Sequence, residues 1–579
     1  MDKTKNAQKK PSIIHLLAPY KGLILLLLVF TLLSNGINLF IPKIVAGGID
    51  AFTAHHFAFR PLIIEFTLAV AAIFIFTYLQ GIIQTYASEK VARDLRTKLA
   101  DKISQQSYAF IEQVTPGKIL TNLTADVDSI KMFISQAIVS IVSSLFIIIG
   151  ASILLITINW KLALCVMAII PVIGGTFFFV LRKVRALFKE SRAVIDWLNK
   201  VINESILGSA LIRVINSQQL ESNKFLAANT KAKEFGMGIL SLFAGLIPVI
   251  TFTANMAALS ILALGGHFVI NGSMSLGSFA AFNGYLSMLI FPIIMIGFMS
   301  NVIAQATASF ERITAIIETP DQPETGTLTD NLRGEIELKD VNVTYGQIPA
   351  LRDISFKVNA GSKIAVIGPT AAGKTQLLYL LTGLIKPASG TVHFDGQPID
   401  NYVSESFHRQ VGFVFQDSII FNMSIRENIA FSDTVTDESL QKAIDTAELK
   451  EFIDGLPDGL STIVSERGSS LSGGQKQRIM LARALAINPK VLLLDDFTAR
   501  VDNNTETKIL QNIQQNYPGL TLLSVTQKIA AVEHYDQIIL LMQGEVIAAG
   551  KHDKLMHTSP EYVQLFNSQQ STSNYELQS

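Results

Sequence analysis

The feature that most constrains the fold is a long uncharged stretch in the middle of the chain. From Phe235 to Phe310 there is no Asp, Glu, Lys or Arg. A helix needs about 20 apolar residues to cross the roughly 30 Å of hydrocarbon in a bilayer, so this stretch can cross a membrane twice. The glycine-containing segment from Gly265 to Ser273 predicts the turn between the two crossings.

Four further apolar runs precede that stretch, and each is long enough to span a membrane. They are Gly22–Pro42, Pro61–Ser88, Met132–Trp160 and Leu162–Leu181. The first run has no small-residue cleavage pattern, so we expect it to be retained as a span. The whole chain of 579 residues is 49% hydrophobic and only 16% charged, which favours an integral membrane protein with a soluble part. The sequence therefore predicts six spans.

The basic residues between the runs predict how the spans are oriented. Lys and Arg are concentrated in residues 90–131 and 182–233, whereas the alternate loops carry Arg60 and Lys161. Because cytoplasmic loops are enriched in Lys and Arg, the two long basic loops and both termini should be cytoplasmic. Their apolar spacing predicts helices that continue beyond the membrane, with a reversal in each loop. The formal net charge is zero, so no basic field indicates nucleic-acid binding.

The second half of the chain contains a phosphate-binding motif in its expected context. The apolar strand Lys363–Ile367 leads into a loop with the pattern G-x-x-x-x-G-K-T, and a helical pattern follows. Backbone N–H groups of such a loop face phosphates, the lysine reaches the β- and γ-phosphates and the threonine hydroxyl binds Mg²⁺. The predicted ATP-binding residues here are Gly368, Pro369, Thr370, Ala371, Ala372, Gly373, Lys374, Thr375 and Gln376.

One later motif, Leu471–Gln475, makes the second half resemble a known family, whereas any P-loop ATPase would show the strand Val491–Asp495. Val491–Asp495 is an apolar strand that ends in a carboxylate, and Leu471–Gln475 reads Leu-Ser-Gly-Gly-Gln before a helix. The second half resembles the ABC nucleotide-binding domain, an α/β P-loop NTPase, and the first half resembles the six-helix all-α transmembrane domain of ABC exporters. The expected parts are an N-terminal cytoplasmic segment (1–20), a transmembrane domain (21–317), a linker (318–333), an ABC domain (334–570) and a polar tail (571–579).

The resemblance assigns roles to further residues. Tyr345 matches the aromatic residue that stacks on adenine, and Gln416 matches a glutamine that contacts Mg²⁺ together with Thr375 and Asp495. Residues 462–468 resemble a segment of exporters that contacts the intracellular helices. In this family two ATP-binding domains pack head to tail, so the signature of one subunit completes the site of the other. The residues expected to face a partner's ATP are Ser472, Gly473, Gly474 and Gln475.

The sequence departs from the family at the predicted catalytic centre. Asp496 occupies the place of the glutamate that polarises the attacking water, and Gln527 occupies the place of a histidine. Arg500 stands where a small residue is usual, although Asp502 of the same loop is retained. A glutamine can hydrogen-bond a γ-phosphate but cannot hold a proton as an imidazolium can. We therefore expect a site that binds ATP and hydrolyses it inefficiently.

These patterns resemble one subunit of a heterodimeric ABC exporter in a bacterial inner membrane, with the ATP-binding domain in the cytoplasm. The expected cargo is small and amphipathic, of drug or lipid type. A homodimeric lipid or multidrug exporter and a non-transporting regulatory subunit that binds ATP are the alternatives. The residues expected to face the transport cavity are Phe243, Phe252, Asn255, Phe282, Tyr285 and Phe291.

Overall fold

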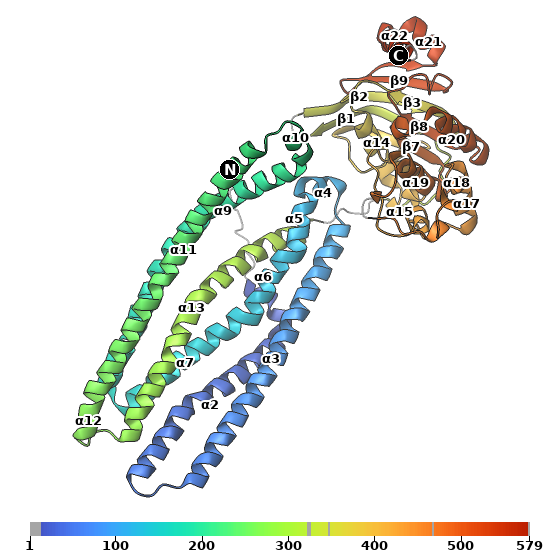
Figure 1. Ribbon diagram of the computed structural model, residues 1–579. Helices are drawn as coiled ribbons and strands as arrows, with labels where there is room; N and C mark the ends of the chain where they lie inside the picture. The colour runs from blue at the N-terminus through green and yellow to red at the C-terminus, as the bar shows by residue number, and fades with distance from the viewer. Residues whose placement is uncertain (1–12, 321–325, 346–347, 466–467, 577–579) are drawn as a thin grey trace, which may run out of the picture. The chain divides into compact units, whose positions relative to one another are not determined.

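The computed structural model of the chain describes residues 13–320, 326–345, 348–465 and 468–576 (Figure 1). It divides into two compact units, Met1–Gln105 with Val114–Pro320, and Gln106–Gln113 with Asp321–Ser579. Part of the expected linker, residues 321–325, lies outside the described residues, as do most of the N-terminal segment, the end of the C-terminal tail and Glu466–Arg467 of the segment before the signature.

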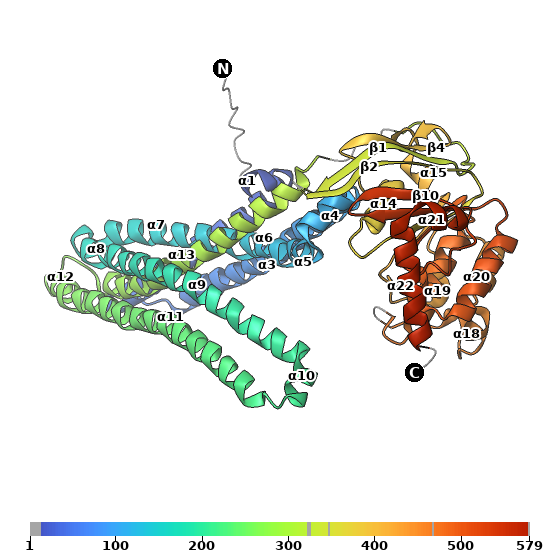
Figure 2. The same cartoon turned by 90° about the horizontal axis from the view of Figure 1, so that it is seen from above.

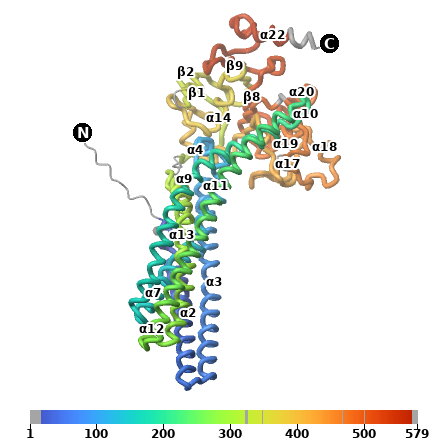
Figure 3. The backbone as a smooth tube through the Cα atoms, turned by 60° about the vertical axis from the view of Figure 1, so that its left-hand side comes forward, coloured from blue at the N-terminus to red at the C-terminus, as the bar shows by residue number. Residues whose placement is uncertain are grey.

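Among the residues that the structure describes, six long helical segments of the first unit are apolar enough to cross a membrane, which confirms the predicted number of spans. Figures 1 and 3 show them running alongside one another. Their main helices are α2 (Lys21–Thr53), α3 (Phe59–Ser104), α7 (Ile138–Ile158), α9 (Ile169–Leu207), α11 (Gln218–Ser260) and α13 (Leu276–Ile317). Shorter helices extend or join them: α1 (Ile13–Leu16), α5 (Pro116–Thr121), α6 (Val127–Met132), α8 (Trp160–Met167), α10 (Ser209–Val214) and α12 (Gly266–Ile270).

The turn between the fifth and sixth spans begins later than predicted. The chain stays helical through a π-helical stretch, Ile261–Gly265, and through α12, so that the turn occupies only residues 271–275. Gly265 does not break the helix because it serves packing instead: a Cβ there would lie 3.0 Å from the Phe279 ring and 3.3 Å from the Leu162 side chain. A glycine inside an apolar helix therefore indicates close helix contact here.

Two residues expected to face the transport cavity are buried in the core of the first unit. Phe282 is 0% exposed and Tyr285 is 1% exposed. The Tyr285 hydroxyl donates to the Leu39 carbonyl oxygen at 3.0 Å, so this polar group is satisfied within the helix packing. By contrast, Phe252 and Phe291 are largely exposed. The prediction of a cavity-facing side chain was thus wrong for Phe282 and Tyr285, because these rings fill the space between α13 and its neighbours.

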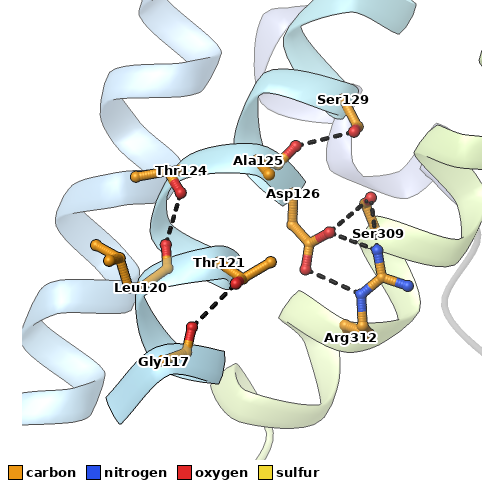
Figure 4. A network of polar contacts seen from close by, with 9 residues as sticks. All are labelled: Gly117, Leu120, Thr121, Thr124, Ala125, Asp126, Ser129, Ser309 and Arg312. Carbon is orange, nitrogen blue, oxygen red and sulfur yellow. Dashed lines mark hydrogen bonds and ion pairs between the residues drawn. The ribbon is translucent and has the colours of Figure 1, made fainter. Parts of the chain in front are cut away.

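A buried carboxylate connects two helices near the cytoplasmic end of the first unit (Figure 4). Asp126 lies at the end of a π-helical stretch, Asn122–Asp126, and is 3% exposed. Its oxygens accept hydrogen bonds from Arg312 Nε at 2.9 Å, from Arg312 Nη2 and from Ser309 Oγ at 2.9 Å. Arg312 and Ser309 both lie on α13, so one charged network ties the third span to the sixth.

The described part of the second unit forms two sheets, and Figures 1 and 2 label several of their strands. The antiparallel sheet has the order β2-β1-β4-β5, from β1 (Ile336–Tyr345), β2 (Ile348–Val358), β4 (Ser389–Phe394) and β5 (Gln397–Pro398). The larger sheet has the order β10-β9-β3-β8-β7-β6, from β3 (Lys363–Ile367), β6 (Val411–Val414), β7 (Val491–Asp495), β8 (Thr521–Val525), β9 (Gln537–Met542) and β10 (Glu545–Gly550). All its pairs are parallel except β10 with β9.

Alternate residues of the larger sheet enter two hydrophobic cores, one on each face. Leu492 and Leu494 of β7 face the core that includes α19, whereas Val491 and Leu493 face the core that includes α14 and the antiparallel sheet. The helices of this unit are α4 (Tyr108–Val114), α14 (Lys374–Leu381), α15 (Ser404–His408), α16 (Ile425–Ile429), α17 (Asp437–Thr446), α18 (Lys450–Asp454), α19 (Gly473–Ala486), α20 (Asn503–Asn516), α21 (His552–Thr558) and α22 (Pro560–Glu576). Burial of strands on both faces explains their continuous apolar sequences.

Candidate nucleotide site

The predicted phosphate loop lies between β3 and α14, at the carboxyl end of a central parallel strand. Its glycines take backbone angles that need glycine: φ is +155° at Gly368 and +97° at Gly373. A Cβ at Gly368 would lie 2.0 Å from the Leu541 carbonyl oxygen, which leaves no room for a side chain. Lys374 begins α14, and its Nζ donates to the carbonyl oxygens of Gly368 and Pro369, both at 2.8 Å. The lysine is therefore held over its own loop.

A cleft around this loop brings together most of the residues predicted from the sequence. It gathers the P-loop with residues at the ends of β7 and β8, as expected for neighbouring parallel strands. Its lining comprises Pro349, Ala350, Thr370, Ala371, Ala372, Gly373, Lys374, Thr375, Gln376, Gln416, Asp495, Asp496, Val525, Gln527, Gln543 and Gly544.

The environment of Asp495 suits a divalent cation. Burial raises the pKa of this carboxyl, and the neighbouring Asp496 charge acts in the same direction, while Thr375 and Lys374 oppose the shift. The residue is 1% exposed, and its Oδ2 has no hydrogen-bond partner among the described residues. A buried carboxylate oxygen aimed beside a threonine hydroxyl is the kind of hard ligand that Mg²⁺ takes. The donor set of Thr375, Gln416 and Asp495 therefore fits the predicted ion.

Asp496 follows β7 in a left-handed backbone conformation, with φ +47° and its N–H bonded to the Val525 carbonyl oxygen at 2.9 Å. Burial raises the pKa of its carboxyl, and the charges of Lys374 and Lys528 counteract that effect. No motif in the sequence indicates Lys528. Lys528 Nζ also lies 3.8 Å from Glu506 Oε2 and 3.5 Å from Asn503 Oδ1. Two cations thus act on the carboxylate at the predicted catalytic position.

Tyr345 ends β1, is 41% exposed and is not among the residues that line the cleft. Its hydroxyl donates to Gln376 Oε1 in the first turn of α14, which links the predicted adenine-stacking residue to the P-loop. Helix α4 belongs to the same unit, and the Tyr108 ring packs edge-on against Tyr379 with the centroids 5.5 Å apart. Nothing in the sequence pattern indicated Tyr108.

The signature residues do not line the same cleft. Ser472 caps α19: its Oγ accepts from Gln475 N–H at 3.2 Å, and Gln475 Oε1 accepts from Ser472 N–H at 2.8 Å. Arg500 packs along this turn, since a Cβ at Gly473 would lie 3.1 Å from Arg500 Cδ. Asp502 is likewise outside the cleft and caps α20 by accepting from Thr505 N–H at 2.9 Å, which lowers the pKa of its carboxyl.

Comparison with known proteins identifies the family. Residues 24–293 match the ABC transporter transmembrane region, and residues 351–499 match the ABC transporter domain. The ABC transporter ATP-binding protein YfiB of Bacillus subtilis, labelled uncharacterized, is 33% identical over 488 residues, which cover 84% of this chain and 85% of that protein. The chain belongs to the ABC transporter family.

This ABC transporter has the layout of an exporter, with membrane and ATP-binding domains fused in one chain. It is 30% identical over 560 residues to the probable multidrug resistance ABC transporter ATP-binding/permease protein YheI of B. subtilis, with 94% of each chain covered. Its fold matches the structure of a bacterial Atm1-family ABC exporter with ATP bound at a TM-score of 0.75 and 23% identity, covering 95% of this chain and 99% of that one. It is a multi-pass protein of the inner membrane with a cytoplasmic ATP-hydrolysing domain.

Proposed function

We propose that this ABC exporter is one subunit of a heterodimer, and that its own nucleotide site holds ATP while hydrolysing it slowly. The observation that carries the proposal is the composition of the cleft. Lys374, Thr375 and Asp495 provide what ATP binding needs, whereas the two positions that would drive hydrolysis are Asp496 and Gln527. Both positions lack the residue that the family uses for hydrolysis, whereas the residues that bind ATP are present. This combination favours a site that binds ATP without hydrolysing it quickly.

The binding residues act on the phosphates and on one divalent cation. The P-loop N–H groups and Lys374 would hold the β- and γ-phosphates, and Tyr345 would stack on the adenine. Thr375, Gln416 and Asp495 would hold Mg²⁺. When bound, this ion would neutralise part of the negative charge of the phosphates. The unpartnered Oδ2 of Asp495 is the structural support for that assignment.

Asp496 and Gln527 weaken hydrolysis for different reasons. Asp496 carries the charge of the family's glutamate on a side chain one methylene shorter, so a water that it orients is displaced by about 1 Å, which can cost ~100-fold in rate. Burial raises the pKa of its carboxyl, and the charges of Lys374 and Lys528 oppose that rise only in part, so the shorter side chain is the reason for slow hydrolysis at this position. Gln527 can donate a hydrogen bond to the γ-phosphate but brings no positive charge.

The signature supports an assembly in which the two subunits share their sites. Ser472–Gln475 is intact and capped, yet it does not line this chain's own cleft. In the head-to-tail arrangement that the resemblance implies, these residues complete the ATP site of the partner subunit. This subunit would thus retain one ATP in its own site and support turnover in the other.

Small amphipathic compounds are the proposed cargo. The support is the similarity to a probable multidrug resistance transporter, together with the exposed aromatic side chains Phe252 and Phe291 in the fifth and sixth spans. A homodimeric lipid or drug exporter is the principal alternative, and a regulatory subunit that transports nothing is the other. Transport into inverted membrane vesicles separates the regulatory alternative from both exporters.

The experiment that tests the degenerate site uses the complex purified through a tag on this chain. Asp496→Glu combined with Gln527→His should raise the ATPase rate of that complex, while the affinity for ATP stays within twofold. Lys374→Ala in the same background should remove the gain. An unchanged rate in the double variant would refute the assignment of these two residues, and a complex containing two copies of this chain alone would refute the heterodimer.

A further inference from the structure

The C-terminal helix of the chain is anchored beside the loop that carries Gln527. Tyr562 of α22 is fully buried, and its hydroxyl lies 2.7 Å from His552 Nδ1, while the rings of His552 and Phe566 are in contact. Tyr562 shares one hydrophobic core with Ile529 and Val532, which follow the loop. Helix α22, seen at the C-terminal end of the unit in Figure 2, is therefore fixed to the same core as the loop.

One side chain of this helix binds the loop backbone at two points. Gln569 Nε2 donates to the Gln527 carbonyl oxygen at 2.6 Å, and Gln569 Oε1 accepts from the Ile529 N–H at 2.9 Å. The two bonds flank Lys528, whose own side chain reaches towards α20 on Glu506 and Asn503. A carboxamide that uses both its donor and its acceptor in this way fixes the direction of the loop.

We propose that Gln569 is a positioning residue of the nucleotide site: through the loop backbone it aims the Gln527 side chain at the γ-phosphate. The proposal rests on the function proposed above, in which Gln527 faces that phosphate. Gln527 lines the cleft with Lys374 and Asp496, whereas Gln569 lies outside the cleft and acts only through the loop. The C-terminal helix thereby takes part in distinguishing ATP from ADP, and its attachment sets how firmly this subunit retains ATP.

The test is a double-mutant cycle on the purified full-length chain, with affinities measured for a non-hydrolysable ATP analogue and for ADP, both with Mg²⁺. Gln569→Ala should weaken analogue binding roughly two- to tenfold, the range of one hydrogen bond, and leave ADP binding unchanged. Gln527→Ala should give a similar loss, and the double variant no further loss, because Gln569 acts through that side chain. Gln570→Ala, an exposed glutamine next to Gln569, is the matched control.

A second variant, Gln569→Glu, distinguishes a positioning role from a general loss of stability. It can still accept from the Ile529 N–H but faces the Gln527 carbonyl oxygen with an acceptor, so it should show the same selective loss while ADP binding, which reports an intact fold, stays unchanged. Three results would overturn the proposal. The Gln569 variants could lose affinity for the analogue and for ADP equally, they could lose affinity for the analogue even in the Gln527→Ala background, or they could lose no affinity at all. Equal binding of ADP and the analogue by the unmodified chain would refute the placement of Gln527 at the γ-phosphate. That result would count against the proposed function itself, and not only against the role of Gln569.

Discussion

Removing the guanidinium of Arg312 should destabilise the membrane unit, because it strands a buried charge. The Asp126 carboxylate has three donors, and two of them belong to Arg312. Breaking a fully buried ion pair costs about 3–5 kcal/mol. The Arg312 side chain is 47% exposed, so water can reach part of the site, and we expect a lower cost of roughly 2–3 kcal/mol for Arg312→Ala.

The measurement is the thermal unfolding midpoint of the purified protein, monitored by tryptophan fluorescence in one detergent throughout. Arg312→Ala should lower it, and adding Asp126→Asn should restore part of the loss, because the stranded charge is then removed. Arg96→Ala is the matched control: Arg96 pairs with Asp128 at 2.7 Å, but both side chains are exposed, so the expected cost is below about 1 kcal/mol. Equal effects of the two arginine variants, or no recovery with Asp126→Asn, would refute the reasoning.

Two further predictions concern the nucleotide site. Burial raises the pKa of Asp495, so this carboxyl should protonate at a higher pH than an ordinary aspartate does. Mg²⁺-dependent nucleotide binding should therefore weaken as the pH drops into that higher range. An affinity independent of pH would contradict this. Tyr345→Ala should weaken ATP binding by about tenfold, since stacking a base on an aromatic ring contributes ~1–3 kcal/mol, whereas Tyr345→Phe should bind like the unmodified chain; equal binding by all three proteins would exclude adenine stacking.

The parts of the fold that follow from local pattern could be predicted from the sequence. Long uncharged runs have few alternatives to a membrane span, and a glycine-containing loop between a strand and a helix defines the phosphate cradle. The limits of local pattern appear at Gly265, where a glycine allows two helices to approach rather than ending one. They also appear at Phe282 and Tyr285, because the spacing of aromatic residues does not tell which side of a helix other helices cover.

Contacts between distant residues could not be predicted in the same way. Asp126 and Arg312 are far apart in the chain, and only the packing of the third span on the sixth pairs them. Lys528 acts on Asp496 because β7 and β8 are neighbours in the sheet, and Gln569 reaches the loop only once α22 is seated on the core. None of these three contacts leaves a motif in the sequence.

The central claim is that this chain binds ATP well and hydrolyses it slowly, and the most direct test measures both properties on one preparation. The complex purified through a tag on this chain, in lipid nanodiscs, should bind Mg²⁺-ATP, lose part of that binding in Lys374→Ala, and hydrolyse ATP faster when Asp496→Glu is combined with Gln527→His. Equal ATPase rates for the unmodified complex and the double variant would contradict slow hydrolysis at this chain's site.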